Sequence, residues 1–570
     1  MPSVDIMRHK RILLLAAGIV SFGTLWLVSG VAQPVTPTTS PGNIAILPPA
    51  GMAGDPVAQP VKMPSNPAQA ALIRRGEYLA VAGDCQYCHS LPGGTPYAGG
   101  VPLQTPFGAI FSPNITPDKT YGIGSYSNAQ FWNVLHRGIS PGHSLLVFPH
   151  YLYPVMPWQN FNKLSRHDVM AIKAYLDSLP PAPIKSRANE MAFPFNVRAG
   201  QLALRILSPT STKIHYGASW SPQVRNGAFL VEALAHCSAC HGQRNIILMV
   251  KPKRNLAGGQ ILAQSWYPPD ISSSKTGIGA WSPDVLFNYL HHDGALGAGA
   301  PFGPMKAVVE DSLSRLPASD VHDIVAYLQT ASPKEQSAIP PATAAAPTAG
   351  GAALYYQNCA RCHGAQGQGL ANNFPNLAGN QALWNGPADN LISMILGGYK
   401  PWHPAQSSMP EFNQKLSDTQ IAALANYVRT SWGNKAPVDV TAADVSALRP
   451  LASDWVELST GDTQATLNGA VVDDISGTLQ LFGNPDNCIV SAHLASSAGT
   501  AVDLSGACSP GGHLAGFATL AGKTVPVTLT LRMEGAAAGG SGLSGVLLSG
   551  PLGSQHETLN ARIALISPTA

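Results

Sequence analysis

The chain repeats the stretch Cys85-Gln86-Tyr87-Cys88-His89 in two further copies, Cys237-Ser238-Ala239-Cys240-His241 and Cys359-Ala360-Arg361-Cys362-His363. Two cysteines separated by two residues and followed by histidine are typical of covalent haem attachment. The thiols bond to one porphyrin, and the histidine is delivered to the iron as its proximal ligand. A zinc site would instead need a second pair of ligands nearby. Because the three copies use six of the eight cysteines, we predict three covalently bound haems c and a role in electron transfer.

Each motif needs a second axial ligand, since histidine alone leaves the iron five-coordinate. A methionine stands in a proline-flanked loop after each motif, and we predict that these thioethers are the sixth ligands: Met156, Met305 and Met409. A thioether raises the haem potential relative to a second histidine. Other methionines are interpreted as packing residues: Met170, Met249 and Met394. Histidines in the same regions are rival ligands: His143, His150, His291, His292 and His403.

Helical patterns accompany every motif. Apolar residues recur three and four apart over 165–176, 319–328 and 417–428, and each pattern begins at a serine that can cap a helix, followed by an acidic residue suited to the first turn. The helix that leads into each motif carries a glycine: Gly76, Gly227 and Gly351. Because a residue without a side chain permits close approach, we predict that the leading and closing helices of each segment cross in contact.

Length and composition bound the architecture. At about 100 to 200 residues per domain, 570 residues predict three to five domains. The net charge of only +3 provides no concentrated basic face of the kind that nucleic-acid binding needs. The sequence contains no nucleotide-binding glycine loop, no pterin or flavin signature and no nucleophile triad. We therefore expect no substrate chemistry from this chain alone.

The amino-terminal region predicts export from the cytoplasm. Basic residues from Arg8 to Arg11 precede an uncharged stretch over 12–32, which is long enough to cross a bilayer and ends in small residues that a signal peptidase could use. We interpret residues 1–32 as an export signal that is either cleaved or kept as an anchor. The basic flank would stay in the cytoplasm, so the chain is expected at the periplasmic face of the bacterial inner membrane.

The remaining boundaries follow from composition. Stretches rich in Pro, Gly and Ala predict a tether over 33–67 and a linker over 333–350. Between them we expect three cytochrome segments, here called the first, second and third segments: 68–184, 185–332 and 351–440. The first two segments share the further patterns Pro113-Asn114-Ile115-Thr116 and Pro269-Asp270-Ile271-Ser272, which indicates duplication.

The carboxy-terminal region differs in character. Short apolar runs separated by Gly-, Ser- and Asn-rich turns over 451–570 predict a small β-rich domain. Cys488 and Cys508 are the two cysteines outside the haem motifs. Because the periplasm is oxidising, we predict that they form a disulfide. The fold class expected from the whole sequence is mainly α, with three tandem cytochrome segments followed by this β-rich domain.

The first haem motif with its preceding Gly83-Asp84, the stretch Asn114-Ile115-Thr116-Pro117-Asp118, Met156-Pro157 and the two later motifs resemble a known family. They are similar to the three-haem cytochrome c subunits of membrane-bound dehydrogenases of acetic acid bacteria. The resemblance covers roughly residues 68–440 and implies three class I cytochrome c domains. It also implies that each motif and the loop methionine that follows it serve one haem.

The resemblance also implies partners. Members of the family accept electrons from a catalytic subunit that oxidises alcohols, aldehydes, gluconate or sugar alcohols, and they pass the electrons to membrane ubiquinone. Phe148-Pro149-His150 and the stretch 193–198 look more like the versions that are paired with molybdopterin/iron–sulfur aldehyde dehydrogenases. We therefore expect a large catalytic subunit with a small iron–sulfur subunit. A quinoprotein alcohol or polyol dehydrogenase is the alternative partner.

Two other functions remain open at this point. A catalytic multihaem enzyme such as a peroxidase would need one haem with an open sixth position, and the three methionine candidates argue against it. A carrier that feeds a terminal oxidase directly would need no dedicated dehydrogenase, so co-purification with a dehydrogenase subunit would exclude it.

Overall fold

The computed structural model describes residues 57–332 and 349–453 and the strands between 455 and 564, with short gaps that include 145–147, 261–265 and 401–407. The expected export signal over 1–32 lies outside the described residues, as does most of the expected linker. Within the part of the chain that is described, no helix is long and apolar enough to cross a membrane. The structure is mostly helical up to residue 453, as the sequence predicts.

The first segment places short strands between its helices. Its elements are α2 (Pro67–Ala82), α3 (Cys85–His89), β1 (Pro102–Thr105), β2 (Gly108–Phe111), α4 (Asn128–Arg137), β3 (Ile139–Ser144), β4 (Phe148–Tyr151), α5 (Trp158–Phe161) and α6 (Arg166–Ser178). Strand β5 (Glu190–Met191) adds to β2, although it lies beyond residue 184. The last residues of the expected tether run along this segment, because the Tyr175 hydroxyl donates a 2.5 Å hydrogen bond to the Ala58 carbonyl oxygen.

The second and third segments are helical. The second contains η1 (Arg198–Gly200), α7 (Gln201–Leu207), α8 (Pro222–Phe229), η2 (Leu230–Leu234), α9 (Ser238–His241), η3 (Pro252–Arg254), α10 (Pro283–His291), α11 (Pro304–Ala307), η4 (Val308–Ser312), η5 (Leu313–Arg315) and α12 (Ala318–Thr330). The third contains α13 (Ala349–Asn358), α14 (Ala360–His363), α15 (Gln381–Trp384), α16 (Asp389–Gly397) and α17 (Asp418–Thr430). Helix α18 (Ala442–Ser453) follows and adds Val445 to the core of the third segment.

The predicted helix crossings are confirmed in all three segments. A Cβ atom built on Gly76 of α2 would lie 1.9 Å from the Ala171 carbonyl oxygen of α6, and one on Gly227 of α8 would lie 1.9 Å from the Asp323 carbonyl oxygen of α12. The same test on Gly351 of α13 gives 2.3 Å to a carbonyl oxygen of α17. Only glycine fits at these distances, so the crossing glycines fix how closely each pair of helices packs.

The closing helices begin at the predicted serine in two cases and not in the third. Ser165 accepts a hydrogen bond from the Asp168 N–H, and Ser417 forms a reciprocal capping box with Gln420. The prediction for Ser319 is wrong, because α12 begins at Ala318 and its N-cap is Pro317. The Pro317 carbonyl oxygen accepts from the N–H groups at positions 320 and 321. Ser319 therefore lies inside the first turn of the helix and not at its N-cap.

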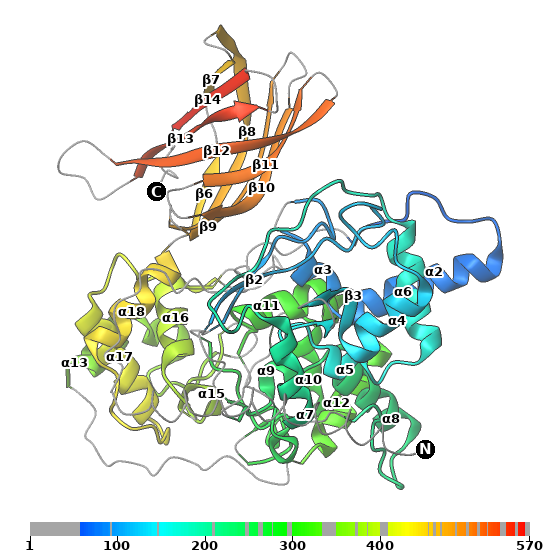
Figure 1. The fold of residues 1–570 in the computed structure, drawn as a ribbon. Coiled ribbons are helices and arrows are strands. Elements are labelled where there is room, and N and C mark those ends of the chain that lie inside the picture. The colour runs from blue at the N-terminus through cyan, green and yellow to red at the C-terminus, as the bar shows by residue number, and fades with distance from the viewer. Residues whose placement is uncertain are drawn as a thin grey trace.

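The first two segments share one hydrophobic core. Leu79 and Phe161 from the first belong to the same buried cluster as Val231 and Leu234 from the second. The third segment has its own cluster, which includes Tyr355, Leu396 and Leu424. In Figure 1 the helices of the first segment lie beside those of the second, and α16, α17 and α18 lie on the other side of the second. The second segment is therefore in the middle.

The strands after residue 454 form one antiparallel sheet. Its members are β6 (Trp455–Ser459), β7 (Thr463–Leu467), β8 (Ala470–Asn484), β9 (Asn487–Ser496), β10 (Ala501–Ser509), β11 (His513–Leu520), β12 (Lys523–Gly535), β13 (Leu543–Leu552) and β14 (Glu557–Ala564). From β7 onward each strand pairs with the next, and β14 pairs back with β7, so the sheet closes on itself. Strand β6 pairs with residues 478–482 of β8, beyond the part of β8 that pairs with β7.

Candidate functional site

The three haem motifs open into one continuous cavity of about 1920 Å³. All six motif cysteines, all three motif histidines and the three predicted methionine ligands line it. Each motif forms a single helical turn, in α3, α9 and α14. A helical turn brings positions three apart onto one face, so both thiols of a motif face the cavity beside the histidine.

The motif histidines are all held in the same way. The Nδ1 atoms of His89, His241 and His363 lie 2.8, 2.7 and 2.9 Å from the carbonyl oxygens of Pro113, Pro269 and Pro375. A carbonyl oxygen can only accept, so Nδ1 carries the proton and Nε2 presents its lone pair. Burial also lowers the pKa of each of these imidazoles. The rings are therefore neutral at pH 7, which is the form that binds a metal.

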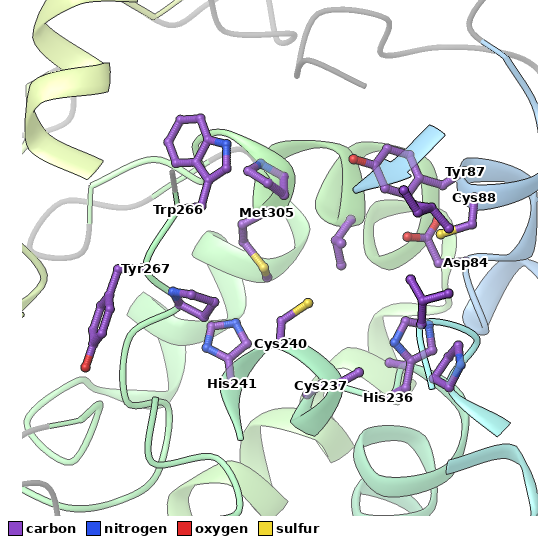
Figure 2. Close-up of a pocket in the computed structure, with 18 of the residues that line it drawn as sticks. Asp84, Tyr87, Cys88, His236, Cys237, Cys240, His241, Trp266, Tyr267 and Met305 are labelled. Carbon is purple, nitrogen blue, oxygen red and sulfur yellow. The ribbon is translucent and has the colours of Figure 1, made fainter. Parts of the chain in front are cut away.

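The three candidate methionines line the same cavity as the histidines. Figure 2 shows the Met305 thioether and the His241 ring pointing toward one another, with Cys240 beside them. Met156 ends a tight turn in which its N–H donates to the Tyr153 carbonyl oxygen at 3.2 Å. Met409 is held by two backbone hydrogen bonds of 2.8 Å with Tyr399. Backbone hydrogen bonds thus position Met156 and Met409. The loop prediction for Met305 is wrong, because this residue lies in the single helical turn α11, which begins at Pro304.

The other candidates from the sequence fall in different places. Met170 packs against the shared core, whereas Met394 on α16 also lines the cavity. Met249 and His403 lie outside the described residues. Of the rival histidines that are described, His150 lines the cavity. Its Nδ1 lies 2.6 Å from the Ser140 hydroxyl, so that nitrogen is already engaged.

Burial keeps the first thiol of each motif uncharged. It raises the pKa of Cys85, Cys237 and Cys359 to about 12. An uncharged thiol is compatible with an apolar cavity wall, where an isolated thiolate would be poorly solvated. This donor set fits haem c, because each centre combines two thiols, an imidazole Nε2 and a thioether around one space. A haem bound there supplies reversible one-electron chemistry at its iron.

Two polar residues to which the sequence assigns no role lie between the first and second centres. Asp84 and His236 directly precede their motifs, and both have left-handed backbone conformations, with φ of 50° and 38°. Burial, followed by the nearby Asp311, raises the pKa of Asp84 well above its usual value. Burial lowers the pKa of His236 to about 4. Figure 2 draws both beside Cys88 and Cys237. Their shared position before a repeated motif is the signal that could have identified them.

Comparison with known proteins agrees with this geometry. The cytochrome c family model matches residues 348–432. The chain is 34% identical over 421 residues to the cytochrome c subunit of the alcohol dehydrogenase (quinone) of Gluconacetobacter polyoxogenes, which covers 69% of this chain and 88% of that protein. It is 35% identical over 402 residues to the gluconate 2-dehydrogenase cytochrome c subunit of Pantoea cypripedii, covering 66% and 90%. The fructose dehydrogenase cytochrome subunit of Gluconobacter japonicus is 35% identical over 429 residues, covering 69% and 85%.

The helical fold, the motif geometry and the family match define a c-type cytochrome with covalently bound haem. More particularly, the chain belongs to the family of cytochrome c subunits of dehydrogenases. It is an electron-transfer subunit, and the catalytic subunit of such a complex is a separate protein.

Proposed function

We propose that this chain carries three haems c and passes electrons from a periplasmic dehydrogenase to membrane ubiquinone. The single observation that supports this most strongly is the continuous cavity that all three motifs share. The attachment residues are Cys85, Cys88, Cys237, Cys240, Cys359 and Cys362. The axial ligands are His89, Met156, His241, Met305, His363 and Met409. We assign the domains expected from the sequence, except that β5 extends the first segment and α18 extends the third, and we take the β-rich region as a fourth folded unit.

The contacts between segments support a linear order of the three centres. Asn160 of the first segment donates to the Ser238 hydroxyl at 3.1 Å, inside the second motif. A Cβ atom built on Gly299 of the second segment would lie 3.9 Å from Pro375 Cβ, whose residue holds His363. The second centre therefore lies between the other two. Electrons are expected to enter at one end of this row and leave at the other.

The residues of this chain have three tasks in the transfer. The proline carbonyl groups orient the imidazoles, so each Nε2 atom stays at one position through many redox cycles. The methionines supply a second ligand that favours the reduced state relative to a second histidine. The mainly apolar cavity wall limits water around the centres, which reduces the rearrangement that a change of charge requires.

The partner enzyme would supply the substrate oxidation that we do not expect from this chain alone. We assign a molybdopterin/iron–sulfur aldehyde dehydrogenase, with a large catalytic subunit and a small iron–sulfur subunit, because of the stretches 148–156 and 193–198. A quinoprotein alcohol or polyol dehydrogenase is the alternative, and the similarity to the cytochrome c subunit of an alcohol dehydrogenase (quinone) favours it. Export by residues 1–32 would bring the chain to the periplasmic face of the inner membrane.

The test is detergent purification of the native protein, followed by mass spectrometry of every co-purifying chain, a haem-to-protein ratio and an assay of ubiquinone reduction. We expect three haems per chain, a catalytic dehydrogenase subunit and quinone reduction with that subunit's substrate. A molybdopterin subunit with an iron–sulfur protein supports the aldehyde assignment, whereas a quinoprotein subunit replaces it with alcohol or polyol oxidation. A fully haem-loaded chain that purifies alone would overturn the proposal in favour of a free carrier.

A further inference from the structure

The third segment does not share the core that joins the first two. Its position against the second segment therefore depends on contacts across the boundary between these two segments, here called the seam. The second and third centres lie on either side of the seam. Two contacts at this seam, described below, involve the stretches of chain that hold the candidate ligands themselves. The inference drawn from them rests on the proposed function, because it concerns transfer between the second and third haems.

The first contact holds the backbone segment that orients His241. The Tyr267 N–H donates to Asn390 Oδ1 at 2.9 Å, and Asn390 Nδ2 donates to the Tyr267 carbonyl oxygen at 2.8 Å. Tyr267 lies two residues before Pro269, whose carbonyl oxygen accepts from His241. Gly386 also approaches closely, since a Cβ atom there would lie 2.7 Å from Tyr267 Cε1. One side chain of α16 thus satisfies both polar groups of a residue beside the second centre.

The second contact joins helix α11, which holds Met305, to the segment that holds Met409. The Lys306 ammonium lies 5.3 Å from the centroid of the Tyr399 ring, which is within the range of a cation–π interaction. Lys306 directly follows Met305, and Tyr399 is paired through its backbone with Met409. Lys306 is buried and also lies 3.3 Å from Glu310, so its ammonium is held in place. The candidate sixth ligands of the second and third centres are therefore connected through a single side-chain contact.

We propose that Asn390 and Tyr399 are positioning residues that fix the third haem against the second and so set the rate of electron transfer between them. Neither side chain is a ligand in the set assigned above. Each acts on a backbone segment that holds one, Asn390 through Tyr267 and Tyr399 through Met409. Loss of both contacts should let the third segment move away from the second while each segment keeps its own core and its own haem ligands.

The experiment uses the full chain, produced with its haems, and four variants. Flash photoreduction delivers one electron per molecule, and the phase that does not depend on protein concentration reports transfer between haems. The loss of two hydrogen bonds and one cation–π contact lowers the population of the docked arrangement, and we expect about tenfold slower transfer in Asn390→Ala/Tyr399→Leu. Asn390→Ala alone should be intermediate, and Tyr399→Phe should keep the parent rate because its ring still faces Lys306.

Asn226→Ala is the matched control. It removes one asparagine side-chain hydrogen bond, from Asn226 Nδ2 to the Asp323 carboxylate at 2.7 Å, on an exposed surface within the second segment. It should transfer at the parent rate. Haem content and the spectra of methionine-bound ferric haem are recorded for every chain, because a merely structural role of the seam would change these as well.

The outcomes separate the two proposals. A parent chain with fewer than three haems would contradict the proposed function itself. A double variant with three haems, unchanged spectra and the parent transfer rate would overturn the positioning role. If the double variant lost haem, Asn390→Ala alone would decide, since its side chain is only partly buried: unchanged transfer would contradict the role and slower transfer would support it.

Discussion

At the scale of single residues, proline carbonyl groups organise the three centres. Pro113, Pro269 and Pro375 each precede an asparagine or aspartate, and each accepts from the Nδ1 of its motif histidine. Asn114 and Asp270 each close a turn, because the side-chain oxygen accepts a hydrogen bond from the N–H two residues later. This Asx turn presents the proline carbonyl to the cavity. The proline carbonyl oxygen sets the tautomer of all three histidines, and the Asx turn accompanies it in the first two centres. Asn376 instead donates to the Ala378 carbonyl oxygen at 2.9 Å.

Met409 and Met394 both line the cavity near the third motif, so the choice of ligand there can be tested directly. We expect Met409→Ala to remove the absorption of methionine-bound ferric haem from one of three haems and to lower the potential of that haem. Met394→Ala should keep the spectrum, because Met394 lies on α16 and serves as packing. A spectrum lost in Met394→Ala and kept in Met409→Ala would reverse the assignment.

The buried carboxyl group of Asp84 should affect stability in a pH-dependent way. Because burial raises its pKa in the folded chain, the folded state holds this proton to higher pH than the unfolded state does. The free energy of unfolding therefore falls as pH rises from the unfolded pKa, about 4, through the raised folded pKa. Asp84→Asn, which tolerates the left-handed conformation, should remove this fall and be more stable than the parent at neutral pH.

Urea unfolding between pH 4 and pH 8 would measure this effect. Asp284→Asn on the exposed start of α10 is the control, and it should change the pH profile little. If Asp84→Asn were less stable than the parent at pH 7, the charged carboxylate would instead be stabilised in the fold, with Arg315 as its nearby cation.

At the scale of secondary-structure elements, the crossing glycines control helix packing. A side chain at Gly351 would meet the backbone of α17, whereas nothing lies within 4 Å of a Cβ atom at the neighbouring Gly350. We expect Gly351→Ala to destabilise the third segment by about 1–3 kcal/mol. Gly350→Ala should be neutral or stabilising by up to about 1 kcal/mol, because alanine is the better helix former. Thermal unfolding followed by haem absorbance would compare them, and equal effects would contradict the packing argument.

The register of the closed sheet bears on the predicted disulfide. Strands β9 and β10 pair Ile489 with Ala507, so Cys488 and Cys508 occupy the next opposing positions. Opposing residues of antiparallel strands have Cα separations that a disulfide can span. We expect peptide mapping without reductant to find the Cys488–Cys508 bridge, and Cys508→Ser to cost about 3 kcal/mol. Free thiols at both positions in the exported protein would contradict the pairing.

At the scale of the whole molecule, shared and separate cores predict how the protein unfolds. Because Val231 is fully buried in the core common to the first two segments, Val231→Ala should lower the stability of both by about 2 kcal/mol. The third segment should keep its own unfolding free energy. Hydrogen exchange followed segment by segment would measure this. Unchanged exchange over 68–184 in the variant would mean that the first two segments unfold independently.

Much of the candidate site could be predicted locally. The haem motifs, the candidate methionines and the crossing glycines are read from short spacings, because attachment chemistry and helix periodicity are imposed within a few residues of the chain. The start of α12 could not be predicted in the same way. The Pro317 carbonyl oxygen accepts the first hydrogen bonds of this helix, so the helix begins upstream of Ser319. The cavity position of Met394 was also missed, because its helical pattern is the same whether that face packs against protein or lines a cavity.

The sequence by itself determined the donor groups of each candidate centre, because its two cysteines, its histidine and its methionine are recognised from residue types at fixed local spacing. The tertiary structure alone decided that three centres share one cavity, that two segments share one core, and that Asn390 and Tyr399 reach the second segment. These features depend on contacts between residues far apart in the chain, such as the one between Tyr267 and Asn390. Such pairs have no common period or motif, so only packing in three dimensions brings them together.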